Sequence, residues 1–366
     1  MENNGNILSK ENSLILRGLA ILSIMFHNYL HMVGFCRENE GSFVQAKVGA
    51  FFGVLAHPGL SLPFDLVSFL GWLGVPVFVF LTGYGLAVKY GSEVRIDKSN
   101  FLKNNYLKLF FLLFPAMLFF AAFDVLHGDW SALAKRVVGL SMLHNLYYPR
   151  LCTNPTIYWY FSLTFQYYIL YCFCGKWFKP RNLLILSVLS LVALYPLLLG
   201  HIRTLLSIYK HCFTGWFPLF ALGIWFARDS RPRKWLEEMG SLQAFVLLAF
   251  SGVLVVVMSA RVVPWLVLPV AGLFAFLALA KLALRVRPVA GALRWTGGIS
   301  ACIFVCHPIA RFLLFQRTSA DFCGRVGDFL HLPRHGLLVS LAAYAVLTFV
   351  FACLYQKLQK RLLRKL

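Results

Sequence analysis

Apolar segments of about 20 residues recur along this chain of 366 residues, and a helix needs about that length to cross a bilayer. Hydrophobic residues make up 59% of the chain and charged residues only 13%. Soluble domains carry about twice that share of charge. The sequence therefore predicts an all-α, polytopic membrane protein.

We expect a bundle of about ten transmembrane helices. If the N-terminus is cytoplasmic, Lys and Arg are about twice as frequent in the cytoplasmic connections as in the others, which places both termini in the cytoplasm. One integral membrane domain then covers residues 1–366, with no appended soluble domain. The expected spans are 14–34, 65–88, 105–126, 157–175, 182–199, 211–227, 241–260, 263–284, 299–316 and 335–356.

The formal net charge of +21 would suggest a nucleic-acid partner in a soluble protein. Here the basic residues fall in short connections between spans, where they attract the headgroups of membrane lipids. No aromatic-basic RNA motif accompanies them, so we expect lipid contacts and no nucleic-acid partner.

Two ionisable residues, Arg17 and His27, lie inside the first expected span. Such groups are costly in hydrocarbon, and they usually face a bundle interior or an aqueous cavity. His27 lies about 20 Å along the span, near the membrane midplane, and imidazole exchanges a proton near neutral pH. We expect His27 to act as a general base. The alternative is a buried histidine that is hydrogen-bonded to a neighbouring helix.

Arg17 lies about 80° around the helix from His27 and closer to the cytoplasmic end. Its alternative is a side chain that extends to the interface and has no catalytic part. His31 follows His27 by one helical turn, so a shared metal is conceivable. No nearby carboxylate or cysteine in the sequence completes a ligand set, and we expect no metal.

Lys103 and Lys108 open the third expected span. A lysine ammonium suits the phosphates of an anionic substrate. The alternative is that both lysines anchor the helix on the cytoplasmic side.

Trp159, Ser162 and Gln166 recur at helical spacing in the fourth expected span and share one face. Such a face can stack a sugar and bind its hydroxyls, or it can make ordinary contacts between helices. His307 precedes Pro308 in the ninth span, and it either lines the cavity of His27 or satisfies the helix kink.

Several segments, in this order, resemble the membrane-bound acyltransferase-3 family, whose members acylate bacterial surface glycans. The chain shares with the family an Arg-Gly pair followed by a histidine in the first span and a glycine-containing second span. It also shares a basic segment at the start of the third span, a segment with Trp and Gln in the fourth span and a His-Pro pair near the end of the chain. The resemblance covers nearly the entire chain. The similar segments are 16–27, 74–84, 101–115, 159–168, 217–223 and 299–308.

The resemblance implies an O-acyltransferase of the bacterial inner membrane. Such an enzyme moves an acyl group, usually acetyl, from acyl-CoA to a hydroxyl of a cell-surface or lipid-linked saccharide. His27 then carries the catalytic histidine role, Arg17 is its basic companion, and Lys103 and Lys108 help to bind the donor. Acetyl-CoA is a substrate here, and no bound cofactor is expected. Direct transfer and a covalent acyl-enzyme both remain open.

The chain departs from the family pattern at three places. The spacing between Arg17 and His27 is one residue shorter than in many members. Asn105 stands in place of a usual arginine, and Thr164 in place of a glutamate, so no carboxylate partner of His27 is identified.

A proton-coupled transporter or flippase of a saccharide or lipid-linked substrate is the alternative function. His27 and His307 would then be relay groups within the membrane. The sequence shows neither the internal repeat nor the paired broken helices of many transporters, which disfavours this alternative.

Overall fold

The computed structural model describes residues 6–40, 43–91, 96–147, 158–199, 208–317 and 333–363, and every regular element among them is a helix. The all-α prediction is therefore confirmed. In chain order the elements are α1 (Ser13–Leu30), η1 (His31–Val33), α2 (Gln45–Ala56), α3 (Leu62–Leu70), η2 (Gly71–Leu73), α4 (Gly74–Tyr90), α5 (Lys98–Leu126), α6 (Trp130–Gly139), α7 (His144–Tyr147), α8 (Trp159–Cys174), η5 (Gly175–Trp177), α9 (Pro180–Leu199), α11 (Phe213–Arg228), α12 (Ser230–Glu238), α13 (Ser241–Ser259), α14 (Val262–Trp265), α15 (Leu268–Ala283), α16 (Arg287–Gly298), α17 (Ser300–Arg317) and α19 (Pro333–Leu363).

A helix lies in each of the expected span ranges, but not every helix is long enough to cross a bilayer. In the described part of the chain, 5 helical segments are long and apolar enough, or 6 if the pair α16–α17, bent by 75°, counts as one span. The count of ten spans and the cytoplasmic location of both termini stay predictions. The 5 segments are Ser13–Val33, Leu62–Tyr90, Lys98–Leu126, Ser241–Ser259 and Gly336–Arg361.

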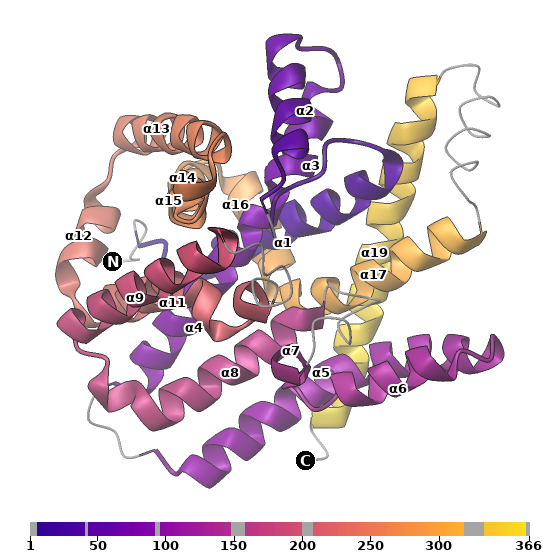
Figure 1. Ribbon diagram of the computed structural model, residues 1–366, viewed down its shortest axis with the longest axis horizontal. Helices are drawn as coiled ribbons and strands as arrows, with labels where there is room; N and C mark the ends of the chain where they lie inside the picture. The colour runs from indigo at the N-terminus through magenta and orange to yellow at the C-terminus, as the bar shows by residue number, and fades with distance from the viewer. Residues whose placement is uncertain are drawn as a thin grey trace.

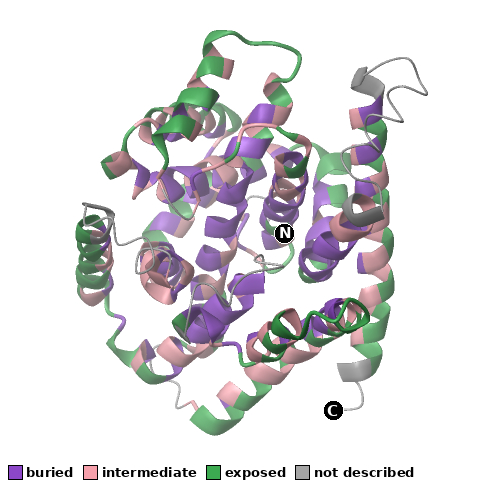
Figure 2. Cartoon of the chain, turned by 45° about the vertical axis from the view of Figure 1, so that its right-hand side comes forward, coloured by how far each residue is buried: buried purple, intermediate pink, exposed green. Residues whose placement is uncertain are grey.

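The outer surface of the bundle is apolar along several helices. Buried residues gather in the middle of the molecule, while the peripheral helices turn exposed faces outward (Figure 2). In lipid such apolar faces need no further partner, because the acyl chains are equally apolar. Exposed apolar side chains follow α9, α13 and α19: Leu184, Ile185, Leu189, Val192, Leu242, Phe245, Val246, Phe250, Val253, Val257, Val346, Val350 and Leu354.

Helix α1 lies in the middle of the bundle (Figure 1). It packs against α3, α4, α15, α16 and α17. His27 is therefore enclosed by other helices, while the exposed side chain of Arg17 faces a cavity described below. This position explains how the first span tolerates both an arginine and a histidine.

Two segments of the family pattern meet where α4 packs against α11. A Cβ atom added to Gly223 would lie 2.1 Å from the carbonyl oxygen of Phe80, and one added to Gly83 would lie 2.2 Å from that of Phe220. Both glycines are needed because the two backbones approach this closely. This contact fixes α4, which lines both cavities described below.

Helix α6 is attached to α5 by a buried ion pair. Arg136 donates from Nε to Oδ2 of Asp124 at 2.8 Å and from Nη2 to Oδ1 at 3.2 Å. The guanidinium carbon also lies 5.0 Å from the ring centre of Phe120. A bidentate arginine–carboxylate pair of this kind fixes orientation as well as distance.

Removing one partner of this pair leaves the other charge buried and unpaired, which costs about 3–5 kcal/mol. We expect Asp124→Ala to unfold at a clearly lower temperature in detergent than the double variant Asp124→Leu/Arg136→Leu, which buries no charge. Thermal unfolding of both purified variants measures this difference. Equal midpoints would contradict the prediction.

Candidate active site

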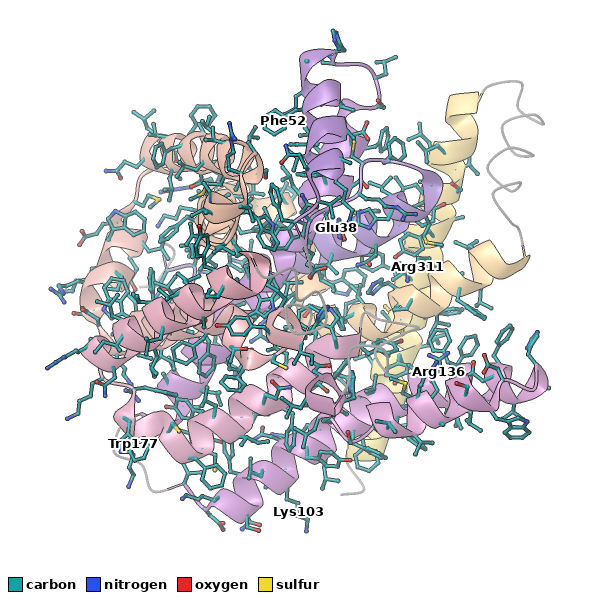
Figure 3. All side chains as sticks on the ribbon, viewed as in Figure 1. Glu38, Phe52, Lys103, Arg136, Trp177 and Arg311 are labelled. Carbon is teal, nitrogen blue, oxygen red and sulfur yellow. The ribbon has the colours of Figure 1, made fainter. Side chains whose placement is uncertain are left out.

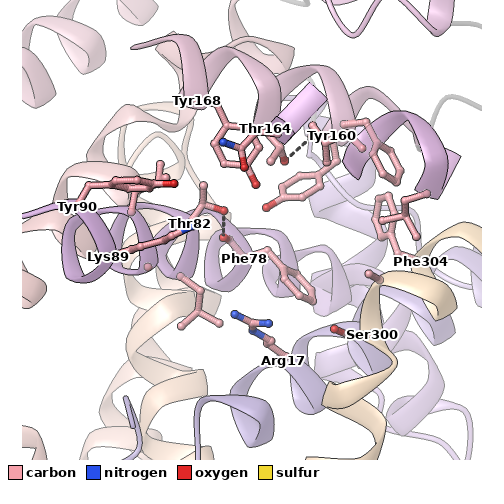
Figure 4. Close-up of a pocket in the computed structure, with 18 residues that line it drawn as sticks. Arg17, Phe78, Thr82, Lys89, Tyr90, Tyr160, Thr164, Tyr168, Ser300 and Phe304 are labelled. Carbon is pink, nitrogen blue, oxygen red and sulfur yellow. Dashed lines mark hydrogen bonds between the residues drawn. The ribbon is translucent and has the colours of Figure 1, made fainter. Parts of the chain in front are cut away.

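Two cavities lie on either side of the middle of the bundle. The first, which we call the Arg17 pocket, has a volume of about 360 Å³ and is walled by α1, α4, α5, α8 and α17. Most of its wall is aromatic or aliphatic. The guanidinium of Arg17 points into it, with Tyr160 and Tyr168 across the cavity (Figure 4). Lys89 and Asn105 add further polar groups.

The second cavity, the His27 pocket, has a volume of about 430 Å³. His27 and His31 line it from α1 and η1, and Trp72 and Trp159 supply aromatic surface. Charged groups come from the loop that follows η1, from α2 and from α17: Arg37, Glu38, Glu40, Lys47 and Arg311.

The two pockets share Tyr160 and Phe304 in their walls. The ring centres of these residues lie 5.7 Å apart, and we call this shared part of the two walls, where the cavities meet, the aromatic partition. Arg17 lines only the first of these two cavities and His27 only the second. Ten residues of helix place them about 15 Å apart along the axis.

His27 is held at its Nδ1 atom, which lies 2.7 Å from the carbonyl oxygen of Ser68. A carbonyl only accepts, so Nδ1 carries the proton and Nε2 keeps its lone pair. Gly71 packs against the Cβ atom of His27, since a Cβ added to this glycine would lie 2.6 Å from it. These contacts fix both the tautomer and the position of the ring.

A carboxylate stands next to the two histidines. His31 Nε2 lies 2.7 Å from Oε2 of Glu38, and the rings of His27 and His31 are 4.0 Å apart between centroids. Burial acts to raise the pKa of Glu38, but the hydrogen bond from His31 and the neighbouring histidine charges hold this pKa below its usual value. Glu38 is thus an ionised carboxylate.

His27, His31 and Glu38 each offer one ligand atom, and these atoms lie within 4.8 Å of one another. Glu38 therefore completes the set of possible metal ligands that could not be recognised in the sequence. His31 Nε2 is already hydrogen-bonded to Glu38 and to the carbonyl oxygen of Ser68, both at 2.7 Å. The cluster is satisfied by these direct contacts.

The expected acceptor residues on α8 divide between the pocket and helix contacts. Trp159 lines the His27 pocket. Ser162 Oγ lies 2.8 Å from Nδ1 of His144, and Gln166 accepts a 3.0 Å hydrogen bond from the backbone N–H of Phe213. Ser162 and Gln166 therefore join neighbouring segments and line neither cavity.

His307 and the two lysines of α5 also lie outside the cavity walls. His307 is fully buried, and its Nδ1 lies 3.1 Å from the carbonyl oxygen of Ile303, one turn earlier on α17. Lys103 and Lys108 are exposed on α5. Lys103 lies at the edge of the molecule, far from Glu38 and Arg311 (Figure 3).

Arg311 is a functional candidate that the motifs did not single out. It lines the His27 pocket, and its Nη1 donates a 3.0 Å hydrogen bond to the carbonyl oxygen of Asn28, the residue after His27. The sequence could have indicated Arg311, because it is a basic residue inside an apolar span and follows His307 by one helical turn.

Near the His27 pocket, Lys210 is buried between two tryptophans. Its Nζ lies 4.4 Å from the ring centre of Trp265 and 5.3 Å from that of Trp216. Burial lowers the pKa of Lys210 to about 8. Burial likewise raises the pKa of Glu40 to about 8, with the Glu38 charge adding to the rise and Lys210 opposing it.

Comparison with known proteins yields a family. A family model described as an acyltransferase domain matches residues 14–357, nearly the whole chain. No curated protein and no solved structure matches the chain. All the residues that wall the two pockets fall inside the matched range.

The raised pKa of Glu40 makes stability depend on pH. Between the ordinary value of 4.5 and about 8, the folded protein binds more protons at this residue than the unfolded chain. The free energy of unfolding contributed by Glu40 therefore falls as pH rises through that window. We expect the unfolding midpoint of the wild type to drop relative to Glu40→Gln from about pH 5 to about pH 8. A difference between the midpoints of the wild type and Glu40→Gln that stays constant with pH would contradict this prediction. A wild-type midpoint that drops by the same amount relative to the exposed control Glu238→Gln, which keeps Glu40, would also contradict it.

Proposed function

The chain belongs to the acyltransferase-3 family and is a membrane acyltransferase, and from this premise we propose that it is an O-acetyltransferase acting on saccharides. Its donor is acetyl-CoA, and its acceptor is a hydroxyl of a cell-surface or lipid-linked saccharide. Its location is the bacterial inner membrane. His27 serves as the general base.

The observation that carries this proposal is the meeting of the two pockets at Tyr160 and Phe304. A transferase needs a donor site and an acceptor site that join at the reacting atoms. Arg17 offers a cation to the donor on one side of the partition. His27 offers a base on the other side.

The Arg17 pocket suits an acyl-CoA. Its aromatic and aliphatic wall can surround a pantetheine arm, and Arg17 and Lys89 can pair with phosphate oxygens. The separation of about 15 Å between Arg17 and His27 along α1 suits an extended arm that brings the thioester to the histidine. Exposed Lys103 and Lys108 would attract the anionic donor toward α5, whose Asn105 reaches the pocket.

The His27 pocket suits a saccharide. Trp72 and Trp159 give flat apolar surfaces on which a sugar ring can pack, and the carboxylates and cations around them can bind hydroxyls. Among the acceptor residues expected from sequence, Trp159 supports this role directly. Roles for Ser162, Gln166 and His307 stay predictions.

The reaction balances without any further reactant. Nε2 of His27 takes the proton of the acceptor hydroxyl while the hydroxyl oxygen attacks the thioester carbonyl carbon. A carbon–oxygen bond forms, the carbon–sulfur bond breaks, and the proton passes from His27 to the departing sulfur to give free CoA. Arg311, in the same pocket, can stabilise the negative charge that develops on the carbonyl oxygen.

Replacing His27 removes the base, and a general base contributes about 10²- to 10⁴-fold to rate. We expect His27→Ala to lower acetyl transfer by that order, because the variant lacks the group that accepts the proton of the acceptor hydroxyl. The measurement uses purified protein in lipid, labelled acetyl-CoA and a panel of lipid-linked bacterial saccharides. His127→Ala, at an exposed position after α5, is the matched control and should retain activity.

Unchanged transfer by His27→Ala would remove the proposed base. Movement of a saccharide across proteoliposomes with no acyl incorporation would overturn the transferase proposal in favour of a transporter.

The donor site makes a second prediction, because a cation in contact with the donor responds to salt less than a cation that acts on it through solvent. We expect Arg17→Gln to raise the KM for acetyl-CoA at both low and high ionic strength. Lys103→Gln and Lys108→Gln should raise it at low ionic strength only, since their charges act through solvent. Steady-state measurement of the KM for acetyl-CoA at two salt concentrations distinguishes the effect of Arg17 from that of the two lysines. An Arg17 effect that salt abolishes would contradict a donor site in this pocket.

A further inference from the structure

We propose that Glu38 is the positioning carboxylate of the catalytic histidine and acts on His27 through His31. This inference rests on the proposed function, since it assigns His27 the base role. Glu38 and His31 do not themselves need to touch the substrates.

The contacts form one connected chain. Oε2 of Glu38 lies 2.7 Å from Nε2 of His31, whose ring stands 4.0 Å from the ring of His27 at an angle of 68°. The carbonyl oxygen of Ser68 lies 2.7 Å from Nδ1 of His27 and also 2.7 Å from Nε2 of His31. Movement of His31 would therefore disturb the atom that fixes the His27 tautomer.

The loop that carries Glu38 is anchored to α3. Ser68 Oγ donates a 2.7 Å hydrogen bond to the carbonyl oxygen of Cys36, and Asp65 Oδ1 accepts a 3.0 Å bond from the Cys36 N–H. Ser68 thus holds the histidines with its backbone and the loop with its side chain. Glu38 and both histidines are therefore positioned through contacts with the same residue, Ser68.

The loop is also anchored on its other side. Lys47 on α2 donates from Nζ to the carbonyl oxygen of Glu38 at 2.6 Å, and Trp265 donates from Nε1 to the carbonyl oxygen of Asn39 at 2.7 Å. These bonds hold the backbone at Glu38 and at the residue that follows it. Hydrogen bonds of this kind restrict the movement of the loop and help to hold the Glu38 side chain in place.

The charge state of the two pocket carboxylates decides which of them can stabilise a protonated His27. Of the two carboxylates in the pocket wall, Glu40 has a pKa near 8 and is largely neutral below that pH. Glu38 is then the negative charge that offsets the imidazolium formed when His27 accepts a proton. The cations of the pocket wall oppose that protonation: Arg37, Lys47 and Arg311. His31 and His211 also line the pocket, and His307 on α17 interacts with His27 through space.

Glu38→Gln tests the role because it keeps the size of the side chain and removes its charge. We expect kcat to fall about ten- to a hundredfold with little change in the KM for acetyl-CoA. We also expect the acidic limb of the kcat profile to move to lower pH, since the imidazolium loses its nearby negative charge. Glu38→Asp should recover part of the rate. A purely structural defect would not move the pH profile.

A double variant shows whether Glu38 acts through His31. If it does, His31→Asn/Glu38→Gln should cost no more than the larger single loss. The exposed carboxylate Glu238 on α12 provides the charge control, and Glu238→Gln should leave kcat and its pH profile unchanged. Additive losses in the double variant would overturn the route through His31.

The outcomes separate this inference from the proposed function. Wild-type kinetics in Glu38→Gln, together with an inactive His27→Ala, would reject the positioning role and leave the transferase intact. An active His27→Ala would reject the base itself. Loss of wild-type activity to a chelator, restored by zinc, would also overturn the inference, because the three residues would then be metal ligands.

Discussion

The carbonyl group of Ser68 is the contact on which the proposed catalytic arrangement, with His27 as the base, depends. It lies in the last turn of α3, where helix carbonyls lack an intrahelical donor and carry the partial negative charge of the helix dipole. His27 and His31 both lie 2.7 Å from its oxygen. One backbone atom therefore selects the tautomer of the base, orients its neighbour and favours a positive charge at this point in the membrane.

The central position of α1 turns this local contact into a two-sided site. Because α1 is surrounded by α3, α4, α15, α16 and α17, each of its faces meets a different set of helices. The face of Arg17 opens on one cavity and the face of His27 on the other. A single helix thus determines the separation between Arg17, the proposed cation for the donor, and His27, the proposed base. One more residue between Arg17 and His27 would turn these two faces by about 100° relative to each other, but it would add only about 1.5 Å to their separation along the axis.

The sequence was sufficient to predict the class of fold and to propose His27 as a candidate, and it was insufficient to identify the side chains that surround this histidine. Composition and apolar length predicted the helical membrane protein, and the cost of an ionisable group in a span singled out His27. Glu38 was out of reach because it lies in a loop whose path depends on hydrogen bonds to α2, α3 and α14. Helical spacing correctly placed Ser162 and Gln166 on one face, but periodicity cannot tell whether that face meets a cavity or another segment.

Two of the departures from the family pattern, at positions 105 and 164, lie on the side of the proposed donor site and away from the proposed base. Asn105 and Thr164 both line the Arg17 pocket, and neither lines the His27 pocket. A glutamate at position 164 would therefore lie on the donor side of the aromatic partition. Thr164 instead donates a 2.8 Å hydrogen bond to the carbonyl oxygen of Tyr160, one of the two residues that form this partition. Substitution at position 164 can thus alter how the donor is held while the contacts of His27 with Ser68 and Gly71 remain in place.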